Sequence, residues 1–258
     1  MSPLKNTLCL GPRIANELQL LVDMPGSVTQ SGALPELQDA VSRFTSRLSA
    51  YQETAVYGFD GRAELVPLCE FGSGAVSLSS FAPQDPSTNR NGAIVKGIDV
   101  LEKQLARSTV PLRFGTLVVF TDGTGHAHRV DRNELFRVLG EVNFEVFVIG
   151  VGAEIDEQEL TRIGRSGAAF SKSPGQVGEQ LDRIAAKIEG CSKRFYLLSY
   201  CSPARAGRHR LTIEPVTNGE HRELEYDFNA DGFGPACDPN RKPTFDVRDP
   251  HLRSQSTR

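Results

Sequence analysis

Short apolar runs alternate with helical patterns between residues 18 and 190 of this chain. The run at 144–150 is apolar at nearly every position, which is typical of a strand buried on both faces. The intervening segments carry apolar residues at spacings of three and four, which predicts helices that lay one apolar stripe on a sheet. Strands that alternate with helices in this way indicate β-α-β units and a parallel sheet.

The pattern predicts six strands and five helices in this region. We expect the strands at 18–22, 55–59, 64–71, 116–120, 144–150 and, weakly, 168–170. The helices are expected to include residues Leu37 to Leu48 and Ile94 to Leu105, to begin again at Asp131, and to cover the segment 156–163 and residues Val177 to Ile188. Asp60-Gly61 is a turn signal, so the second and third strands should pair as a hairpin.

The pattern changes after Gly190, where strands follow one another without helices. We expect strands at 195–200, 208–214 and 220–228, with Asn218-Gly219 as a hairpin turn between the last two. From Asp231 onward the chain is rich in Pro, Gly, Arg and Asp, which favours an extended, largely disordered tail. The predicted organisation is an N-terminal arm (1–16), an α/β domain (17–190), a β extension (191–230) and the tail (231–258).

Composition excludes several classes of protein. The 258 residues are 39% hydrophobic and 24% charged, which is typical of a globular chain rather than a disordered one. A net charge of -3 gives no support for nucleic-acid binding as the main task. The sequence contains no stretch of 18 apolar residues, so we expect no segment that spans a membrane. Residues 1–13 also lack the long apolar run of a secretory signal.

Five cysteines are present, and none forms a Cys-x-x-Cys pair, so a zinc ribbon or a thioredoxin-type site is not expected. Cys201 and Cys237 flank the last predicted strands. They would form a disulfide in an oxidising compartment, or they are small buried apolar residues.

Acidic side chains stand at the ends of two predicted strands. Thr121-Asp122-Gly123 follows the apolar run 117–120, and Asp23 follows the run 18–22. In an open α/β sheet, ligands bind outside the carboxyl ends of the strands. Carboxylates beside hydroxyl groups suit a hard cation such as Mg²⁺. Each aspartate alone is equally consistent with a turn residue, because Asp is common in turns.

Three sequence pieces together resemble the von Willebrand factor type A domain. They are Asp23-Met24-Pro25-Gly26-Ser27 after the first strand, Thr88 before the helix that carries Ile94, and Thr121-Asp122-Gly123 after the fourth strand. They match in order the metal-ion-dependent adhesion site of that family. The resemblance covers roughly residues 17–190. It implies a doubly wound, mostly parallel, Rossmann-like α/β sheet flanked by helices, here with a small C-terminal antiparallel β extension.

The resemblance also implies a set of site residues. Ser27 and Thr88 would be direct hydroxyl ligands of Mg²⁺, or of Mn²⁺ or Ca²⁺, and Asp23 and Asp122 would bind directly or through waters. Pro25 stands where the family has its first Ser, so one hydroxyl ligand is missing, and the alternative is a vestigial site. The residues expected to contact a partner are Met24, Pro25, Gly26, Asn89, Gly123 and Thr124.

The function that the resemblance implies is that of a non-catalytic adhesion or protein-binding module, in which an acidic group of a partner completes the coordination of the metal. The alternatives are a metal-free assembly domain and a Mg²⁺-dependent enzyme. The enzyme would need a base such as His126 or His128, which are otherwise loop residues. No Gly-x-Ser-x-Gly elbow or dinucleotide fingerprint is present.

Two further expectations concern other parts of the chain. Asp60 and Glu64 could form an acid pair, although turn and strand-surface roles explain both. The segment 195–211 resembles the β extension of some bacterial exported proteins. That resemblance favours an extracytoplasmic location over a cytoplasmic one.

Overall fold

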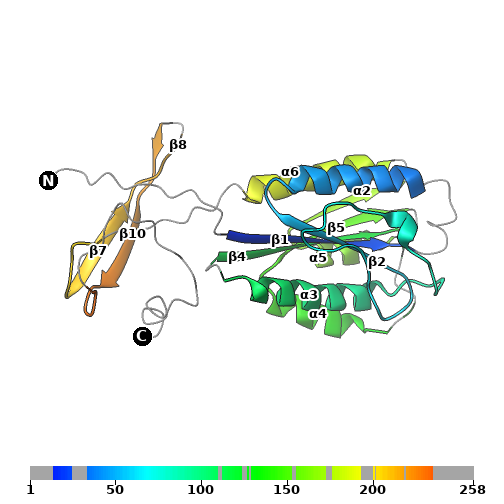
Figure 1. Ribbon diagram of the computed structural model, residues 1–258, viewed down its shortest axis with the longest axis horizontal. Helices are drawn as coiled ribbons and strands as arrows, with labels where there is room; N and C mark the ends of the chain where they lie inside the picture. Colours follow the sequence, from blue (N-terminus) through cyan, green and yellow to red (C-terminus); the bar gives the residue numbers. More distant parts are fainter. Residues whose placement is uncertain are drawn as a thin grey trace. The chain divides into compact units, whose positions relative to one another are not determined.

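A six-stranded sheet forms the centre of the larger of two compact units in the computed structural model (Figure 1). The structure describes residues 14–24, 34–109, 112–123, 127, 129–152, 155–172, 176–192, 200, 202–217 and 219–234. The described residues up to 192 belong to the larger unit, and those from 200 onward belong to the smaller one.

The strand order of the large sheet is β3-β2-β1-β4-β5-β6. The strands are β1 (Ile14–Asp23), β2 (Glu53–Phe59), β3 (Val66–Cys69), β4 (Leu112–Thr121), β5 (Glu145–Val151) and β6 (Gly167–Ser171). All neighbours are parallel except β2 and β3, which form the predicted antiparallel hairpin. The order reverses between β1 and β4, where doubly wound sheets bind their ligands. The predicted α/β fold class is confirmed.

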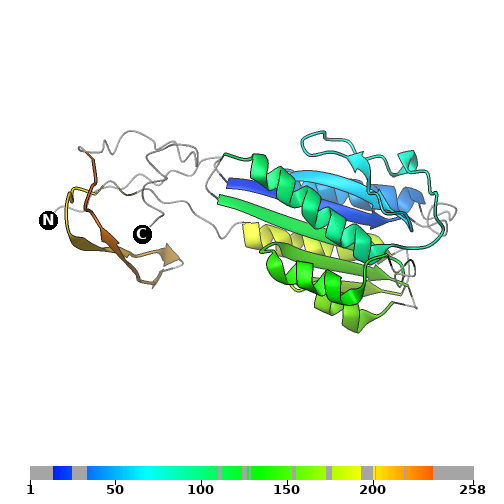
Figure 2. The same ribbon diagram turned by 90° about the horizontal axis from the view of Figure 1, so that it is seen from below.

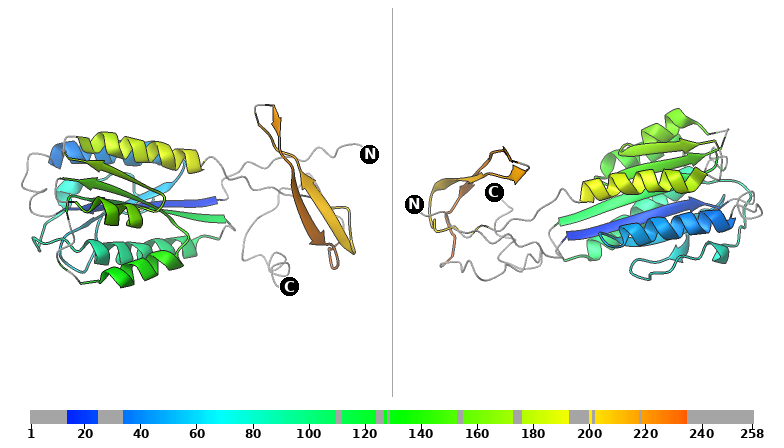
Figure 3. Two further views of the ribbon diagram at one scale, coloured as in Figure 1. Left: turned by 180° about the vertical axis from the view of Figure 1, so that it is seen from behind. Right: turned by 90° about the horizontal axis from the view of Figure 1, so that it is seen from above.

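Helices cover both faces of this sheet (Figures 1 and 2). The helices α2 (Leu34–Leu48) and α6 (Val177–Ser192) lie side by side on one face, as Figure 3 also shows. The helices α3 (Arg90–Arg107), α4 (Arg132–Glu141) and α5 (Glu157–Ile163) cover the other. A short 3-10 helix, η1 (Leu78–Ser80), precedes α3. No described helix is long and apolar enough to cross a bilayer.

Alternating side chains of β1 supply both halves of the core. Leu18, Leu20 and Val22 pack towards α2 and α6, whereas Leu21 packs towards α3. Successive side chains of a strand point to opposite faces, so a strand covered on both sides must be apolar at both parities. The Asp131 side chain caps α4 by accepting hydrogen bonds from the backbone N–H groups of Asn133 and Glu134, as the sequence predicted.

The strand boundaries differ from those predicted because apolar runs mark only the buried part of a strand. β1 begins at Ile14 and β4 at Leu112, and these two residues pair at the start of the ladder. The extra residues of β1 include the polar Asn16 and Glu17, which gave no strand signal. The third strand is shorter than the predicted 64–71, since only Val66–Cys69 belongs to the strand.

The smaller unit contains one interrupted hairpin. β7 (Arg208–Ile213) pairs with β10 (Leu224–Asn229), and β8 (Val216–Thr217) pairs with β9 (Glu220–His221). These last two strands flank the predicted Asn218-Gly219 turn, of which Asn218 lies outside the described residues. The expected single strand at 220–228 is therefore two strands, separated by residues 222–223. The expected strand at 195–200 lies outside the described residues, apart from Tyr200.

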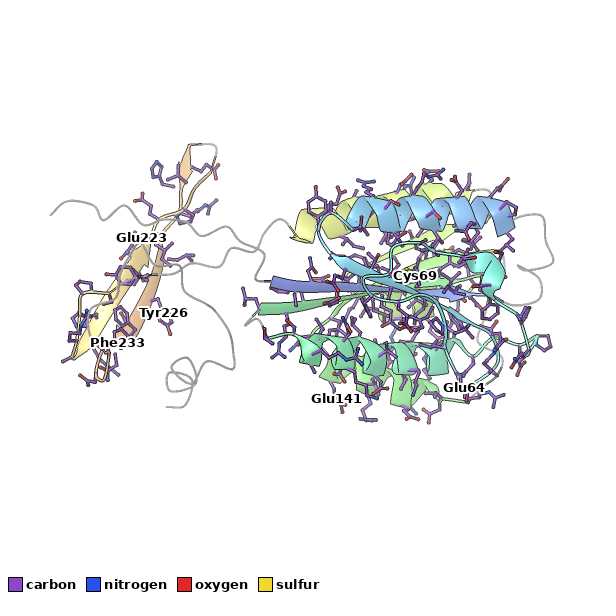
Figure 4. All side chains as sticks on the ribbon, in the orientation of Figure 1. Glu64, Cys69, Glu141, Glu223, Tyr226 and Phe233 are labelled. Carbon is purple, nitrogen blue, oxygen red and sulfur yellow. The ribbon has the colours of Figure 1, made fainter. Side chains whose placement is uncertain are left out.

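Aromatic side chains pack beyond the end of this hairpin. The ring of Phe228 stacks on Phe233 with 5.8 Å between centroids, and the Asp231 carboxylate accepts a hydrogen bond from Gly207 N–H at 2.6 Å. Residues 231–234 were expected to open the disordered tail, but these contacts attach them to the hairpin; Figure 4 shows Phe233 there. Cys69 is a buried free thiol, whereas Cys201 and Cys237 lie outside the described residues.

Gly97 lets α3 approach β1 closely. A Cβ atom at this position would lie 2.8 Å from Leu21 Cδ1 and 3.2 Å from Gln19 Nε2. We expect Gly97→Leu to lower the free energy of unfolding by about 1–3 kcal/mol, because overpacking forces the helix away from the sheet.

The matched control is Gly140→Leu in α4, where a Cβ atom would meet nothing within 4 Å. It should gain up to about 1 kcal/mol from helix propensity. Urea unfolding of both variants tests the comparison, and equal stability of the two would contradict the close approach.

Candidate metal centre

The Asp23 side chain is fully buried at the carboxyl end of β1. Its Oδ2 atom accepts a hydrogen bond of 2.7 Å from the Thr121 hydroxyl, and its Oδ1 atom accepts a longer one of 3.4 Å from the Thr88 hydroxyl. Val22 and Phe120 are register partners, so Asp23 and Thr121 lie side by side at the ends of adjacent strands. Three segments far apart in the sequence therefore meet at one carboxylate.

The strand alternation explains why Asp23 and Thr121 face each other. Leu21 on β1 and Val119 on β4 both pack towards α3. Two residues further along, the side chains return to the same face. Asp122 and Gly123 follow directly and are only partly buried. The edge thus combines one buried carboxylate with a second carboxylate that reaches solvent.

The loop that carries Thr88 is held by a second buried carboxylate, Asp60. Its Oδ2 atom accepts hydrogen bonds from the N–H groups of Gln84 at 2.9 Å and Asp85 at 3.3 Å. The Arg62 guanidinium contacts both Asp60 oxygens at 2.7 and 2.8 Å. Asn89 N–H donates to Asp60 O at 3.0 Å. Asp60 has the turn role that the sequence favoured over an acid pair with Glu64: it accepts a hydrogen bond from Arg62 N–H at 2.9 Å, pairs with the Arg62 guanidinium and organises the loop.

The second and third sequence pieces are joined by their own hydrogen bonds. Ala127 N–H donates to Thr88 O at 3.1 Å. The Arg129 side chain donates to Gly61 O at 2.6 Å and contacts Asp85 at 3.4 Å. These bonds hold the Thr88 loop against the segment that follows Asp122.

Burial strongly raises the pKa of Asp23 above its usual value, and repulsion from Asp122 adds to the shift. The hydrogen bonds from Thr121 and Thr88 and the charge of Arg90 oppose it. The Arg90 guanidinium is itself buried and pairs with Glu159 of α5 at 3.1 Å. The nearest positive charge is therefore already engaged by another carboxylate.

These residues fit a divalent cation bound through oxygen atoms. Asp23, Asp122, Thr88 and Thr121 supply carboxylate and hydroxyl oxygens, which hard cations prefer, and Mg²⁺ readily keeps waters in its remaining positions. Among the described residues, no group of three or more His, Cys, Asp and Glu side chains could hold a metal. A cation here would depend on two carboxylates, on hydroxyl groups and on water.

The structure describes only some of the predicted site residues. Asp23, Thr88 and Asp122 come together at the carboxyl end of the sheet. Ser27, Pro25, Gly26 and Thr124 lie outside the described residues, as do His126 and His128.

Two of the predicted partner contacts are corrected. The Met24 side chain is fully buried among the apolar residues of the core, and its backbone N–H donates to Phe59 O at 2.8 Å, which continues the pairing of β1 with β2. The Asn89 side chain caps α3 by accepting from Gly92 N–H at 3.3 Å and donates to Arg62 O at 2.9 Å, so it is committed to the fold.

Sequence reasoning missed two residues of this edge. Thr121 was part of the motif but was not assigned to the site, although the two-residue period of the strand puts it on the same face as Val119. Arg90 gave no signal, because its position beside Asp23 depends on how α3 packs against β1.

No protein-family model matches the chain, and comparison with curated proteins gives no match. Solved structures do match. They include proximal thread matrix protein 1 from the mussel byssus with a zinc-occupied MIDAS motif (TM-score 0.54, 14% identity, 68% of this chain and 48% of that one). A von Willebrand factor type A protein from Catenulispora acidiphila matches with TM-score 0.53 and 15% identity over 67% of this chain and 42% of that one.

The pilus adhesin SpaC from Lactobacillus rhamnosus GG matches with TM-score 0.51 and 13% identity over 86% of this chain and 38% of that one. The chain thus spans less than half the length of each of these three structures. At these identities the likeness shows the fold alone: the chain has the von Willebrand factor type A fold.

We expect Asp60→Asn to destabilise the protein at neutral pH. Burial alone would raise the pKa of Asp60, but hydrogen bonds from Arg62, Gln84 and Asp85 outweigh it and hold the pKa at about 2. Since the pKa is lower in the folded state than in the unfolded chain, the ionised carboxylate stabilises the fold above about pH 4. This contribution, on the order of 2 kcal/mol, is lost as the pH falls towards 2.

Urea unfolding at several pH values checks this expectation. The stability difference between wild type and Asp60→Asn should be largest at pH 7 and should shrink below pH 4. The control is Glu141→Gln, whose exposed pair with Arg137 should contribute less than about 1 kcal/mol. A difference that does not depend on pH would contradict the assigned role of the ionised carboxylate.

Proposed function

We propose that this domain is a non-catalytic protein-binding module whose carboxyl sheet edge holds a divalent cation. Asp23, Thr88 and Asp122, together with Ser27 as the resemblance implies, would hold the ion. An Asp or Glu side chain of a partner protein would complete its coordination. The proposal includes Mg²⁺ as the physiological ion, with Mn²⁺ or Ca²⁺ as substitutes.

One observation carries the proposal: a fully buried carboxylate, that of Asp23, lies beside a second carboxylate, that of Asp122, at the switch point of the sheet. A buried charge is costly unless an opposite charge compensates it. Arg90, the nearby cation, is paired with Glu159. A divalent ion would turn the repulsion between the two aspartates into attraction, and its outward positions would be open to a partner because Asp122 and Gly123 reach solvent.

The fold supports an adhesion or assembly role rather than an enzyme. Among the described residues of this edge, the polar side chains are carboxylates, hydroxyls, one capping amide and paired guanidinium groups. The hydroxyl that donates to a carboxylate at 2.7 Å, that of Thr121, is fully buried and so is not presented to a substrate. The same fold occurs in a byssus thread matrix protein and in a pilus adhesin. We extend the proposal to an extracytoplasmic location, where such contacts between proteins are made.

The second candidate function is a metal-free assembly domain. Pro25 favours it, because a proline supplies no hydroxyl ligand at the position where the family has a Ser. In that case the loops alone would bind the partner. The negative charge of Asp23 would be offset by Arg90 or removed by protonation.

Calorimetric titration of the full chain with MgCl₂ and MnCl₂ distinguishes the two functions. We expect saturable binding by the wild type and its loss in Asp122→Asn, because one of the two carboxylates is gone. The matched control is Asp99→Asn on α3, which removes an exposed carboxylate paired with Lys103 and should leave binding unchanged. A folded wild type that takes up neither ion at millimolar concentration would leave the metal-free function.

A substitution of Asp23 should separate stability from function. We expect Asp23→Asn to raise Tm in metal-free buffer, because it removes a buried charge that is repelled by Asp122. Each kcal/mol gained corresponds to roughly 2–4 °C for a chain of this size. The variant should lose the increase in Tm that Mg²⁺ gives the wild type by binding the folded state.

Thermal unfolding with and without 10–100 mM MgCl₂ gives both readouts. These concentrations are roughly 100 times the Kd of a weak Mg²⁺ site, so binding to the folded state would raise Tm measurably. Asp99→Asn again serves as the control and should follow the wild type in both buffers. A Tm that falls in Asp23→Asn without metal would show that the carboxylate is needed for folding itself.

A further inference from the structure

A polar hollow of about 520 Å³ lies at the opposite edge of the large sheet from Asp23. Its walls come from the beginning of β1, the turn between α2 and β2, and the last turn of α3. In Figures 1 and 2 the last turn of α3 lies beside the start of β1, because the helix runs antiparallel to the strand. Glu17 and Asp23 are six residues apart on β1, so the two sites are about 20 Å apart.

Glu17 is the unusual residue of this hollow. Its side chain is only 6% exposed, yet its Oε2 atom has no hydrogen-bond partner within the described part of the chain. The Gln104 side chain of α3 hydrogen-bonds to the carboxylate, and Gln104 in turn accepts a hydrogen bond from Arg107 at 3.4 Å. A buried carboxylate oxygen without a donor, in a side chain that lines a hollow, calls for a donor that the described residues do not supply.

A second carboxylate increases the demand for positive charge. Glu53 is the register partner of Glu17 on the neighbouring strand, and it lines the same hollow. Burial and, to a smaller extent, the charge of Glu53 raise the pKa of Glu17, the hydrogen bond from Gln104 opposes the rise, and the resulting pKa is about 7. The remaining charged side chain of the lining is Arg107, so the hollow has a net charge of about -1 when Glu17 is ionised.

The dimensions and the lining indicate the kind of ligand. A volume of about 520 Å³ is far larger than a single metal ion needs and falls in the range of small-molecule sites. Tyr51, in the turn between α2 and β2, also lines the hollow. A primary ammonium or guanidinium group on a short carbon chain would supply N–H donors, a single positive charge and an apolar body.

We propose that this hollow is a binding site for an organic cation, an ammonium or guanidinium group bound by the carboxylates of Glu17 and Glu53. The group belongs either to a free small amine or to a Lys or Arg side chain of a peptide. The site is independent of the cation at Asp23, so the failure of either proposal leaves the other intact.

Calorimetric titration of the full chain at pH 7.5 with butylammonium and methylguanidinium chloride tests the proposal. We expect saturable binding of at least one cation and no binding of uncharged n-pentanol. N-acetyl-lysine N-methylamide and N-acetyl-arginine N-methylamide form the peptide arm. Tighter binding of these two compounds would assign the site to a partner's side chain, and tighter binding of the simple cations would assign it to a free amine.

Variants locate the binding. Glu17→Gln keeps the shape and removes the charge, and it should weaken affinity by about tenfold or more, as the loss of a charge-assisted hydrogen bond does. Glu53→Gln should weaken affinity by a smaller factor because Glu53 is exposed. The matched control Glu141→Gln on α4 (Figure 4) and the opposite-edge variant Asp122→Asn should bind as the wild type does.

The pH profile gives a readout that a structural role of Glu17 would not move. Affinity of the wild type should increase between pH 6 and pH 8 as Glu17 loses its proton, and the profile of Glu17→Gln should be flat. If Glu17→Gln does not fold, Glu53→Gln and the wild-type profile still decide the matter. Absence of saturable binding by every cation, or equal binding by wild type and Glu17→Gln, would overturn the proposal.

Discussion

Parallel strands bring their carboxyl ends to one edge of a sheet, and here that geometry brings a charged side chain into the protein interior. Asp23 continues a strand whose preceding six residues are all buried, so its carboxylate is enclosed by the same packing that stabilises the fold. The enclosed charge then sets what its neighbours must be. Hydroxyl groups of Thr121 and Thr88 solvate it, and Arg90 lies near enough to oppose its protonation.

The loops around this carboxylate depend on a second one. Asp60 gathers the backbone N–H groups of the segment before Thr88 and is neutralised by Arg62. The two buried aspartates thus have opposite electrostatic situations. Hydrogen bonds to its charged form make Asp60 a stable structural element, whereas Asp23, which has fewer such bonds and lies beside Asp122, keeps an unmet demand for positive charge. Asp60 therefore serves as a structural residue, whereas Asp23 is a candidate binding residue.

The same strand carries a polar residue at each end of its buried length. Glu17 and Asp23 both face α3, and the buried amide of Gln19 lies between them, next to Gly97. Burying a carboxylate is costly unless a positive charge compensates it, and at the two ends of the strand such a charge can come from a bound cation. The two ends of β1 therefore offer two separate positions for cations, which differ in kind. The carboxyl end presents several oxygen ligands close together, and the amino end presents a polar hollow lined by two carboxylates.

Much of this arrangement could be predicted from the sequence. Apolar runs that end in Asp23 and Asp122, with helical patterns between them, determined the sheet, its parallel strands and the edge where these aspartates meet, because strand alternation and β-α-β connection are local consequences of residue type. The role of Asp131 as a cap followed for the same reason. The sequence could not reveal that Met24 and Asn89 are committed to the core and to a cap, or that Asp60 pairs with Arg62. Nor could it place Arg90 beside Asp23 or Glu53 beside Glu17. Those relations depend on strand register and on the depth at which α3 sits on β1, and only the packing of the whole domain decides these quantities.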